Sequence, residues 1–135
     1  MDDAALTIRL CEYLARVPGW AWRPDGPYTQ DETGLFYGQI AAAPDRAVGV
    51  RVYGGDDDIG LAERRVQVRF RGDPGVVDAA DRMAGVAFVM LGALDRYRGV
   101  LGATRLSFLP LGADTNGREE RTDNYLITLD NVEAI

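Results

Sequence analysis

The densest carboxylate cluster in the chain is Asp56, Asp57 and Asp58, within the Gly-rich stretch 54–60. Oxygen ligands of this kind can bind a divalent cation. Three consecutive carboxylates point in different directions, however, and no glutamate follows at the spacing of an EF-hand. A two-metal nuclease would need further acids on separate strands, for which Glu63 and Asp130 are the candidates. We therefore expect a solvated acidic loop, with a small carboxylate-dependent hydrolase or nuclease as the alternative.

The other residue types offer little catalytic chemistry. The chain has no histidine, which removes the usual general base near neutral pH and the commonest metal ligand. Its one cysteine, Cys11, falls on the apolar side of a predicted helix and is expected to be inert core. Neither a nucleophile elbow nor a P-loop nor a dinucleotide-binding fingerprint is present. We predict no catalytic residue, no cofactor and no metal.

A second polar segment, residues 111–121, lies between two predicted strands. Its turn is set by Asn116 and Gly117, because this pair favours positive φ. An exposed hairpin tip is the plain interpretation. The functional interpretation is that alternating charge at such a tip gives directional docking onto another copy of the chain. The charged residues are Asp114, Arg118, Glu119, Glu120 and Arg121.

Length and charge limit the class of protein. With 135 residues, 47% of them apolar, the chain suits one globular domain spanning 1–135. Its net charge of −6 makes it a poor candidate for binding nucleic acid, since phosphate contacts need clustered basic residues. No apolar run reaches 18 residues and no signal-peptide pattern is found, so we expect no membrane span and synthesis in the cytoplasm.

The first half of the chain predicts a helix followed by strands. Asp2 or Asp3 can cap a helix whose apolar residues recur at helical spacing until Pro18 and Gly19 stop it. Residues 20–27 are expected to form a turn-rich flap that carries two tryptophans. Strands are predicted at 35–42 and 47–53, joined as a hairpin around Pro44, and at 64–71. The apolar helix positions are Leu6, Leu10, Leu14 and Val17.

The second half predicts one long helix and two strands. Asp73 and Pro74 give a strong helix start, and the helix is expected to run to Tyr97. Strands follow at 105–111 and 124–130. The order predicts an α+β fold, with a largely antiparallel β-sheet flanked by an N-terminal helix and one long central helix. The sheet's outer face should be rich in arginine, and its ends should offer edge strands to neighbours. The predicted buried stripe of the long helix is Val76, Ala80, Met83, Ala87, Met90 and Leu94.

Several of these motifs, taken in order, resemble the tail terminator or minor capsid family of long-tailed bacteriophages. They are the strand 66–72, the helix 73–97, the pattern L-P-L-G-x-D-x-x-G-R at 109–118, and the pair Asn124-Tyr125. The resemblance implies a virion structural protein that forms a homohexameric ring, caps the tail tube, stops its elongation and joins it to the head-completion proteins. It also implies a place in the virion tail, after assembly in the host cytoplasm.

The resemblance implies partners but no catalytic residues. The partners would be other copies of the chain, the tail tube protein and a head–tail connector or stopper protein, with genomic DNA passing through the lumen without specific binding. A ring needs head-to-tail contacts that close. We expect the charged segment 114–121 or the acidic segment 56–58 to make contacts between subunits or between rings. Six copies at −6 would carry −36, which repels DNA. Another neck or tail-tube component, or a separate binding domain of bacterial origin, is the alternative.

Overall fold

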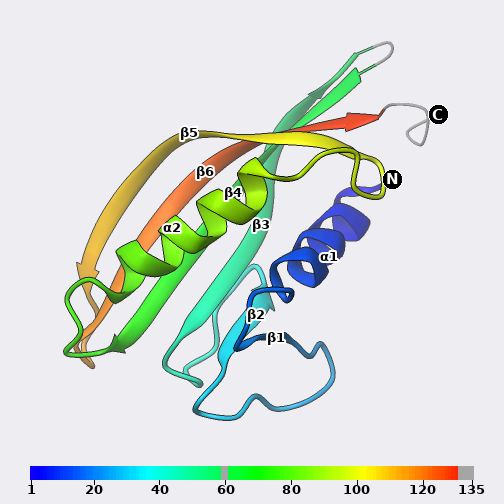
Figure 1. The fold of residues 1–135 in the computed structure, drawn as a ribbon. Coiled ribbons are helices and arrows are strands. Elements are labelled where there is room, and N and C mark those ends of the chain that lie inside the picture. Colours follow the sequence, from blue (N-terminus) through cyan, green and yellow to red (C-terminus); the bar gives the residue numbers. More distant parts are fainter. Residues whose placement is uncertain (59–60, 131–135) are drawn as a thin grey trace.

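The computed structural model describes residues 1–58 and 61–130, and these residues build two helices and six strands (Figure 1). The α+β class and the largely antiparallel sheet predicted from the sequence are confirmed. The elements are α1 Asp3–Leu14, β1 Trp20–Trp22, β2 Thr33–Tyr37, β3 Ala47–Asp57, β4 Leu61–Pro74, α2 Ala79–Gly92, β5 Val100–Ala113 and β6 Arg118–Asp130.

All six strands form one sheet in the order β1-β2-β3-β4-β6-β5. The pairs β1–β2 and β2–β3 are parallel, whereas β3–β4, β4–β6 and β5–β6 are antiparallel. The two edges are therefore unequal. β1 is a strand of three residues, while β5 at the opposite edge has 14.

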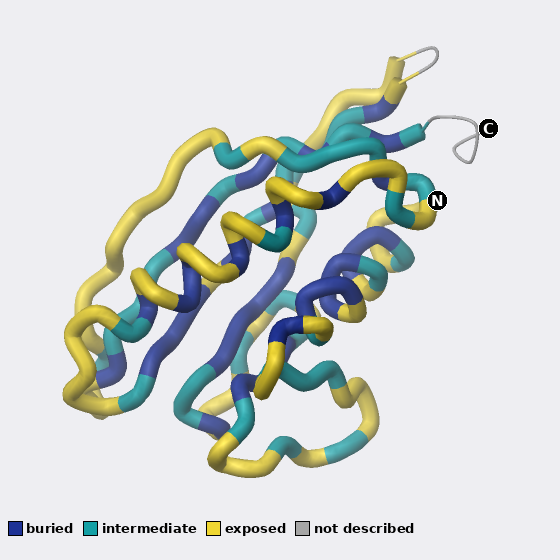
Figure 2. The backbone as a smooth tube through the Cα atoms, in the orientation of Figure 1, coloured by how far each residue is buried: buried dark blue, intermediate teal, exposed yellow. Residues whose placement is uncertain are grey.

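Both helices lie on the same face of the sheet (Figure 1). α1 packs on β1, β2 and β3, and α2 packs on β4, β5 and β6. The core lies between the helices and the sheet, and Figure 2 shows buried backbone along both. No helix of the described residues covers the opposite face, which we call the open face. The largest fully buried core side chains include Tyr125, Phe70, Leu6, Leu10, Leu14, Leu35 and Ile127.

The first helix forms as its sequence predicts. Asp2 caps it, because its carboxylate accepts a hydrogen bond from the Ala5 N–H at 2.7 Å. The helical spacing puts Leu6, Leu10 and Leu14 on the sheet side, where each is at most 1% exposed. Cys11 is fully buried beside them, and burial raises the pKa of its thiol to about 12.

The predicted hairpin between the second and third strands is wrong, because β2 and β3 are parallel. Gly38, with φ +76°, turns the chain at the end of β2. Residues 38–46 then return it to the start of β2, where Ala47 pairs beside Gly34. Pro44 therefore lies in a crossover connection, not in a tight turn. The predicted flap 20–27 also contributes a strand, because β1 pairs with β2 from Trp20 to Trp22.

The long helix is shorter than predicted. Asp73 and Pro74 belong to β4, where Pro74 pairs with Arg118 of β6, and the helix begins after its N-cap residue Asp78. Asp73 instead forms an ion pair with Arg46 at 2.9 Å. Of the predicted stripe, Ala80, Met83 and Ala87 are buried and Met90 is half-buried. Leu94 is buried but follows the end of the helix at Gly92, and Val76 precedes the helix and is exposed.

Candidate functional site

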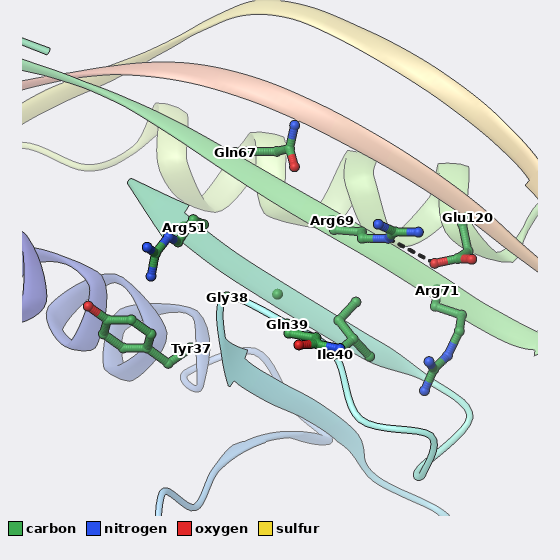
Figure 3. Close-up of a pocket in the computed structure, with 10 residues that line it drawn as sticks. Tyr37, Gly38, Gln39, Ile40, Arg51, Gln67, Arg69, Arg71 and Glu120 are labelled. Atoms are coloured by element: carbon green, nitrogen blue, oxygen red, sulfur yellow. Dashed lines mark hydrogen bonds and ion pairs between the residues drawn. The ribbon is translucent and has the colours of Figure 1, made fainter. Parts of the chain in front are cut away.

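The open face carries a polar hollow of about 820 Å³ between the strands β3 and β4 and the start of the 38–46 connection (Figure 3). Three arginines and one glutamate supply its charge, so the hollow is net positive in a chain of net charge −6. Alternation along the strands puts these side chains on the face away from the helices. This arginine-bearing outer face was predicted. The polar lining residues are Tyr37, Gln39, Arg51, Gln67, Arg69, Arg71 and Glu120.

The three arginines have different environments. Arg71 is only 5% exposed and donates to the carbonyl oxygens of Ala41, Pro44 and Asp45 at 2.7–2.9 Å, so it holds the connection in place. Burial lowers the pKa of Arg71, and the nearby Arg118 lowers it further. Arg69 is exposed and pairs with Glu120 at 2.9 Å, as the dashed line in Figure 3 shows.

Arg51 is the other exposed arginine of the hollow. Its guanidinium lies 5.9 Å from the centre of the Tyr37 ring. Gly49, the residue two before it on β3, lets the connection approach closely, because a Cβ there would lie 2.4 Å from the Gly38 carbonyl oxygen. The hollow therefore presents hydrogen-bond donors on a rigid sheet. It suits polar or acidic groups of an adjoining molecule and offers no pair of nucleophile and base.

The predicted acidic loop is part of a hairpin. Asp56 and Asp57 lie in β3, opposite Glu63 and Ala62 of β4, and the hairpin extends beyond the ends of the helices (Figure 1). Asp57 pairs with Arg64 at 2.8 Å, and Asp56 lies 3.7 Å from Arg65. The part of the predicted stretch 54–60 that lies outside the described residues is 59–60. Within the described ranges no group of three acidic, histidine or cysteine side chains could hold a metal ion.

The predicted polar excursion at 111–121 is much smaller in the structure. β5 continues to Ala113 and β6 begins at Arg118, so four residues make the turn. Asp114 organises the turn, accepting from the backbone N–H groups of Asn116 and Arg118 and from the Arg118 side chain at 2.8–3.0 Å. These hydrogen bonds lower the pKa of Asp114.

Arg118 and Arg121 are internal cations, not exposed tip residues. Arg118 is 6% exposed and also donates to the Ala42 carbonyl and to Asp45. Arg121 pairs with the fully buried Asp123 at 2.7 Å. A change of both arginines to glutamate would therefore disturb the fold. Of the remaining predicted residues, Glu119 lies in β6 opposite Ala113, and Glu120 reaches the hollow on the open face.

The structure adds a surface that sequence reasoning missed. Phe88 of α2 and Phe108 of β5 are both about half exposed, and each has an arginine stacked on its ring. We predict a strand at 105–111 from the sequence but no apolar surface on it. The sequence signal for this apolar surface was the cluster of three leucines and one phenylalanine within those seven residues.

Comparisons with known proteins assign the family. A sequence model described as "Bacteriophage tail terminator protein" matches residues 13–131, which is most of the chain. The chain belongs to the bacteriophage tail terminator family. The match runs from within α1 to past the end of β6, so it takes in the hollow on the open face, the acidic hairpin and the Asp114 turn of this family member.

A solved structure has a similar fold. It is a chain of the "Virion of native gene transfer agent (GTA) particle", with a TM-score of 0.51 and 16% sequence identity. The similarity covers 71% of this tail terminator family member and 78% of the other chain. Among curated proteins no sequence matches. Together, family and fold support a structural protein of the virion tail. Neither helix of the described residues is long and apolar enough to span a membrane.

Proposed function

We propose that this protein is a tail terminator whose copies assemble into a homohexameric ring on the end of the tail tube. The ring stops elongation of the tube and gives the head-completion proteins a surface to bind, while genomic DNA passes through its lumen. The family match over residues 13–131 carries the proposal. The sheet supports it, because two free edges on opposite sides allow each copy to contact two neighbours.

The acidic hairpin fits contacts between copies or between rings. Asp56 and Asp57 remain largely exposed despite their arginine partners, with side chains 76% and 72% accessible. They sit on a hairpin that projects from the sheet, which suits contact with another polar surface. Such contacts weaken with salt, because exposed ion pairs are screened. A variant with Lys at Asp56, Asp57 and Asp58 should stay folded and assemble poorly.

Mass measurement under native conditions tests the ring directly. We expect a closed species of six copies, visible as a ring by electron microscopy. A particle population in which the protein is withheld should contain tails of uncontrolled length, and purified protein should restore normal length. A chain that stays monomeric at every concentration, together with normal tails in its absence, would contradict the proposal.

A carboxylate-dependent nuclease is the competing function from another class. Incubation with DNA in the presence of Mg²⁺ or Mn²⁺ should give no cleavage. Cleavage that disappears in Asp57→Ala would favour the enzyme over the ring.

A further inference from the structure

The open face of β3 and β4 is acidic at one end and basic at the other. The odd-numbered residues of β4 from Glu63 to Arg71 point to this face, because alternate residues share one face of a strand. Glu63 lies in the acidic hairpin, which consists of residues 54–58 and 61–65 at the ends of β3 and β4. Arg69 and Arg71 lie in the polar hollow. One rigid pair of strands thus carries both an acidic projection and a basic concavity.

The acidic hairpin keeps a negative charge after its own ion pairs are counted. Residues 54–65 hold four acidic residues and two arginines. Both arginines already pair with hairpin aspartates, and Arg64 also pairs with Asp3 of α1. With Asp3 included, five carboxylates share two guanidinium groups, so the formal charge is 2 − 5 = −3. The hairpin therefore has more carboxylates than its arginines can neutralise.

Two of these carboxylates lie side by side on the open face. Asp56 of β3 is directly opposite Glu63 of β4 in the antiparallel register. Like charges in such a position destabilise a strand pair. Asp56 has Arg65 at 3.7 Å, whereas Glu63 has no ion pair within residues 1–58 and 61–130. A cation from another molecule would relieve this repulsion, so the pair of carboxylates suits a basic partner.

The polar hollow keeps a positive charge after the same count. Arg69 and Glu120 form an ion pair and cancel. Arg71 and the adjoining Arg118 interact with two aspartates, so this group of four is neutral as well. What remains is the single positive charge of Arg51, for which the described part of the chain supplies no carboxylate. The two aspartates are Asp45 and Asp114.

The rim of the hollow also offers hydrogen-bond donors that its own chain does not use. Arg51 lies beside the Tyr37 ring, and Gln67 of β4 is directly opposite it in the sheet (Figure 3). Among the described residues, neither Arg51 nor Gln67 forms a side-chain hydrogen bond or an ion pair. Because a guanidinium can donate two parallel hydrogen bonds to one carboxylate, Arg51 suits an acidic side chain of a partner.

The acidic hairpin cannot reach the polar hollow of its own chain. Both belong to β3 and β4, and Gly49, which is opposite Arg69 in the hollow, comes seven residues before Asp56. At about 3.3 Å per residue, about 23 Å of hydrogen-bonded sheet separates them. The hairpin also projects away from the hollow, beyond the ends of the helices (Figure 1). A basic partner for it must therefore come from another molecule.

We propose that the acidic hairpin of one copy binds in the polar hollow of a second copy, with Asp56 and Glu63 against Arg51 and Arg69. This contact deepens the proposed ring and rests on it for the expectation of closure. The hairpin and the hollow are separate regions of one chain, so repeated contacts give a head-to-tail arrangement. Contact of hairpin with hairpin, or of hollow with hollow, would instead bring like charges together.

A charge swap tests the contact. Arg51→Glu reverses the charge of the hollow and Glu63→Arg that of the hairpin, and neither change breaks an ion pair of the described chain. Each variant alone should self-associate at least tenfold more weakly than the parent in sedimentation at low salt. The double variant should recover most of this loss, as should an equimolar mixture of the two single variants, because a reversed hairpin fits a reversed hollow.

A matched control separates the contact from a general effect of charge. Arg82→Glu makes the same change on an 80% exposed side chain of α2, on the other face of the sheet, and should assemble like the parent. Thermal melts must first show that every variant folds. Arg51→Gln and Glu63→Gln repeat the test without a new repulsive charge and should weaken association less than the reversals.

The outcomes distinguish this contact from the ring. Parent-like rings in both charge reversals would overturn the contact and leave the ring standing. So would a loss that neither the double variant nor the mixture recovers, or an equal loss in Arg82→Glu. Dimers or open chains in the parent that respond to the swap as described would support the contact and overturn the ring. A parent that never associates overturns both.

Discussion

Replacement of Arg71 by methionine should destabilise the protein far more than the same change at Arg69. The two arginines lie two residues apart on β4, and both project from the open face. Arg71 is buried and bonded to three carbonyl oxygens of the 38–46 connection, whereas Arg69 is exposed and makes one ion pair. Methionine keeps most of the apolar stem and removes the charge and its hydrogen bonds.

The expected loss of unfolding free energy in Arg71→Met follows from those contacts. Each hydrogen bond from a charged group contributes about 1.5–3 kcal/mol. Desolvation of the guanidinium, which also lowers its pKa, offsets several kcal/mol of that sum. A net loss of about 2–4 kcal/mol remains for Arg71→Met. At about 2.1 cal/mol/K per residue, a chain of this length loses about 3.5 °C of Tm per kcal/mol, so the fall should be about 7–14 °C.

Thermal melts followed by circular dichroism measure the difference. Arg69→Met should melt within about 2 °C of the parent, since an exposed pair contributes little. Hydrogen exchange should also quicken in residues 38–46 of Arg71→Met and not of Arg69→Met. Equal melting temperatures for the two variants would refute the argument that Arg71 fastens the connection.

Three further predictions concern the core, the thiol and an exposed ion pair. Val68→Asp should abolish folding, because burial of an unpaired carboxylate costs several kcal/mol of stability. Asp57→Asn should melt like the parent, because Asp57 is exposed. The yield of soluble protein and its thermal melting temperature test both expectations. Cys11, with its pKa raised to about 12, should resist iodoacetamide at pH 8 until the protein is unfolded, and rapid labelling of folded protein would contradict its burial. Hydrogen bonds from Arg23 and Thr29 lower the pKa of Glu32 to about 2, so this pair stabilises the fold above the ordinary carboxyl pKa and loses its effect as the pH falls toward 2. An NMR titration should show a higher Glu32 pKa in Arg23→Met than in the parent, because the largest of these hydrogen-bond contributions is removed while those from Thr29 remain; an unchanged Glu32 pKa would contradict the pairing.

The spacing of apolar residues correctly predicted which side of α1 and of β4 faces the core. The spacing of Leu6, Leu10 and Leu14 gave the buried side of α1, and Asp2 capped it. Alternation in Val66, Val68 and Phe70 placed those side chains in the core, where each is at most 2% exposed. These predictions need only the period of a helix or strand, which the sequence shows directly.

Elsewhere, predictions from local sequence patterns were wrong because segments far apart in the sequence pair with one another. Asp73-Pro74 is a good helix start in isolation, yet pairing of Pro74 with Arg118 keeps the segment in β4. The connection between the parallel strands β2 and β3 is held by Arg71 of β4, a strand that lies beyond both. Likewise, the sequence predicts Arg118 as an exposed turn residue. In the structure its side chain is buried and donates hydrogen bonds to Ala42 and Asp45, more than seventy residues earlier. Sequence spacing carries no information about such partners.

The position of β6 has a consequence for the order in which the molecule can form. This strand comes last along the described chain but lies between β4 and β5, and it pairs with both. A nascent chain that ends before Arg118 contains the residues of both helices and of five strands, yet β5 has no neighbour in the sheet and the half covered by α2 stays open. The half built from α1, β1, β2, β3 and β4 can assemble earlier. Synthesis of residues 118–130 is thus the step that joins the two halves, and until then β4 and β5 are exposed to other nascent chains and to chaperones.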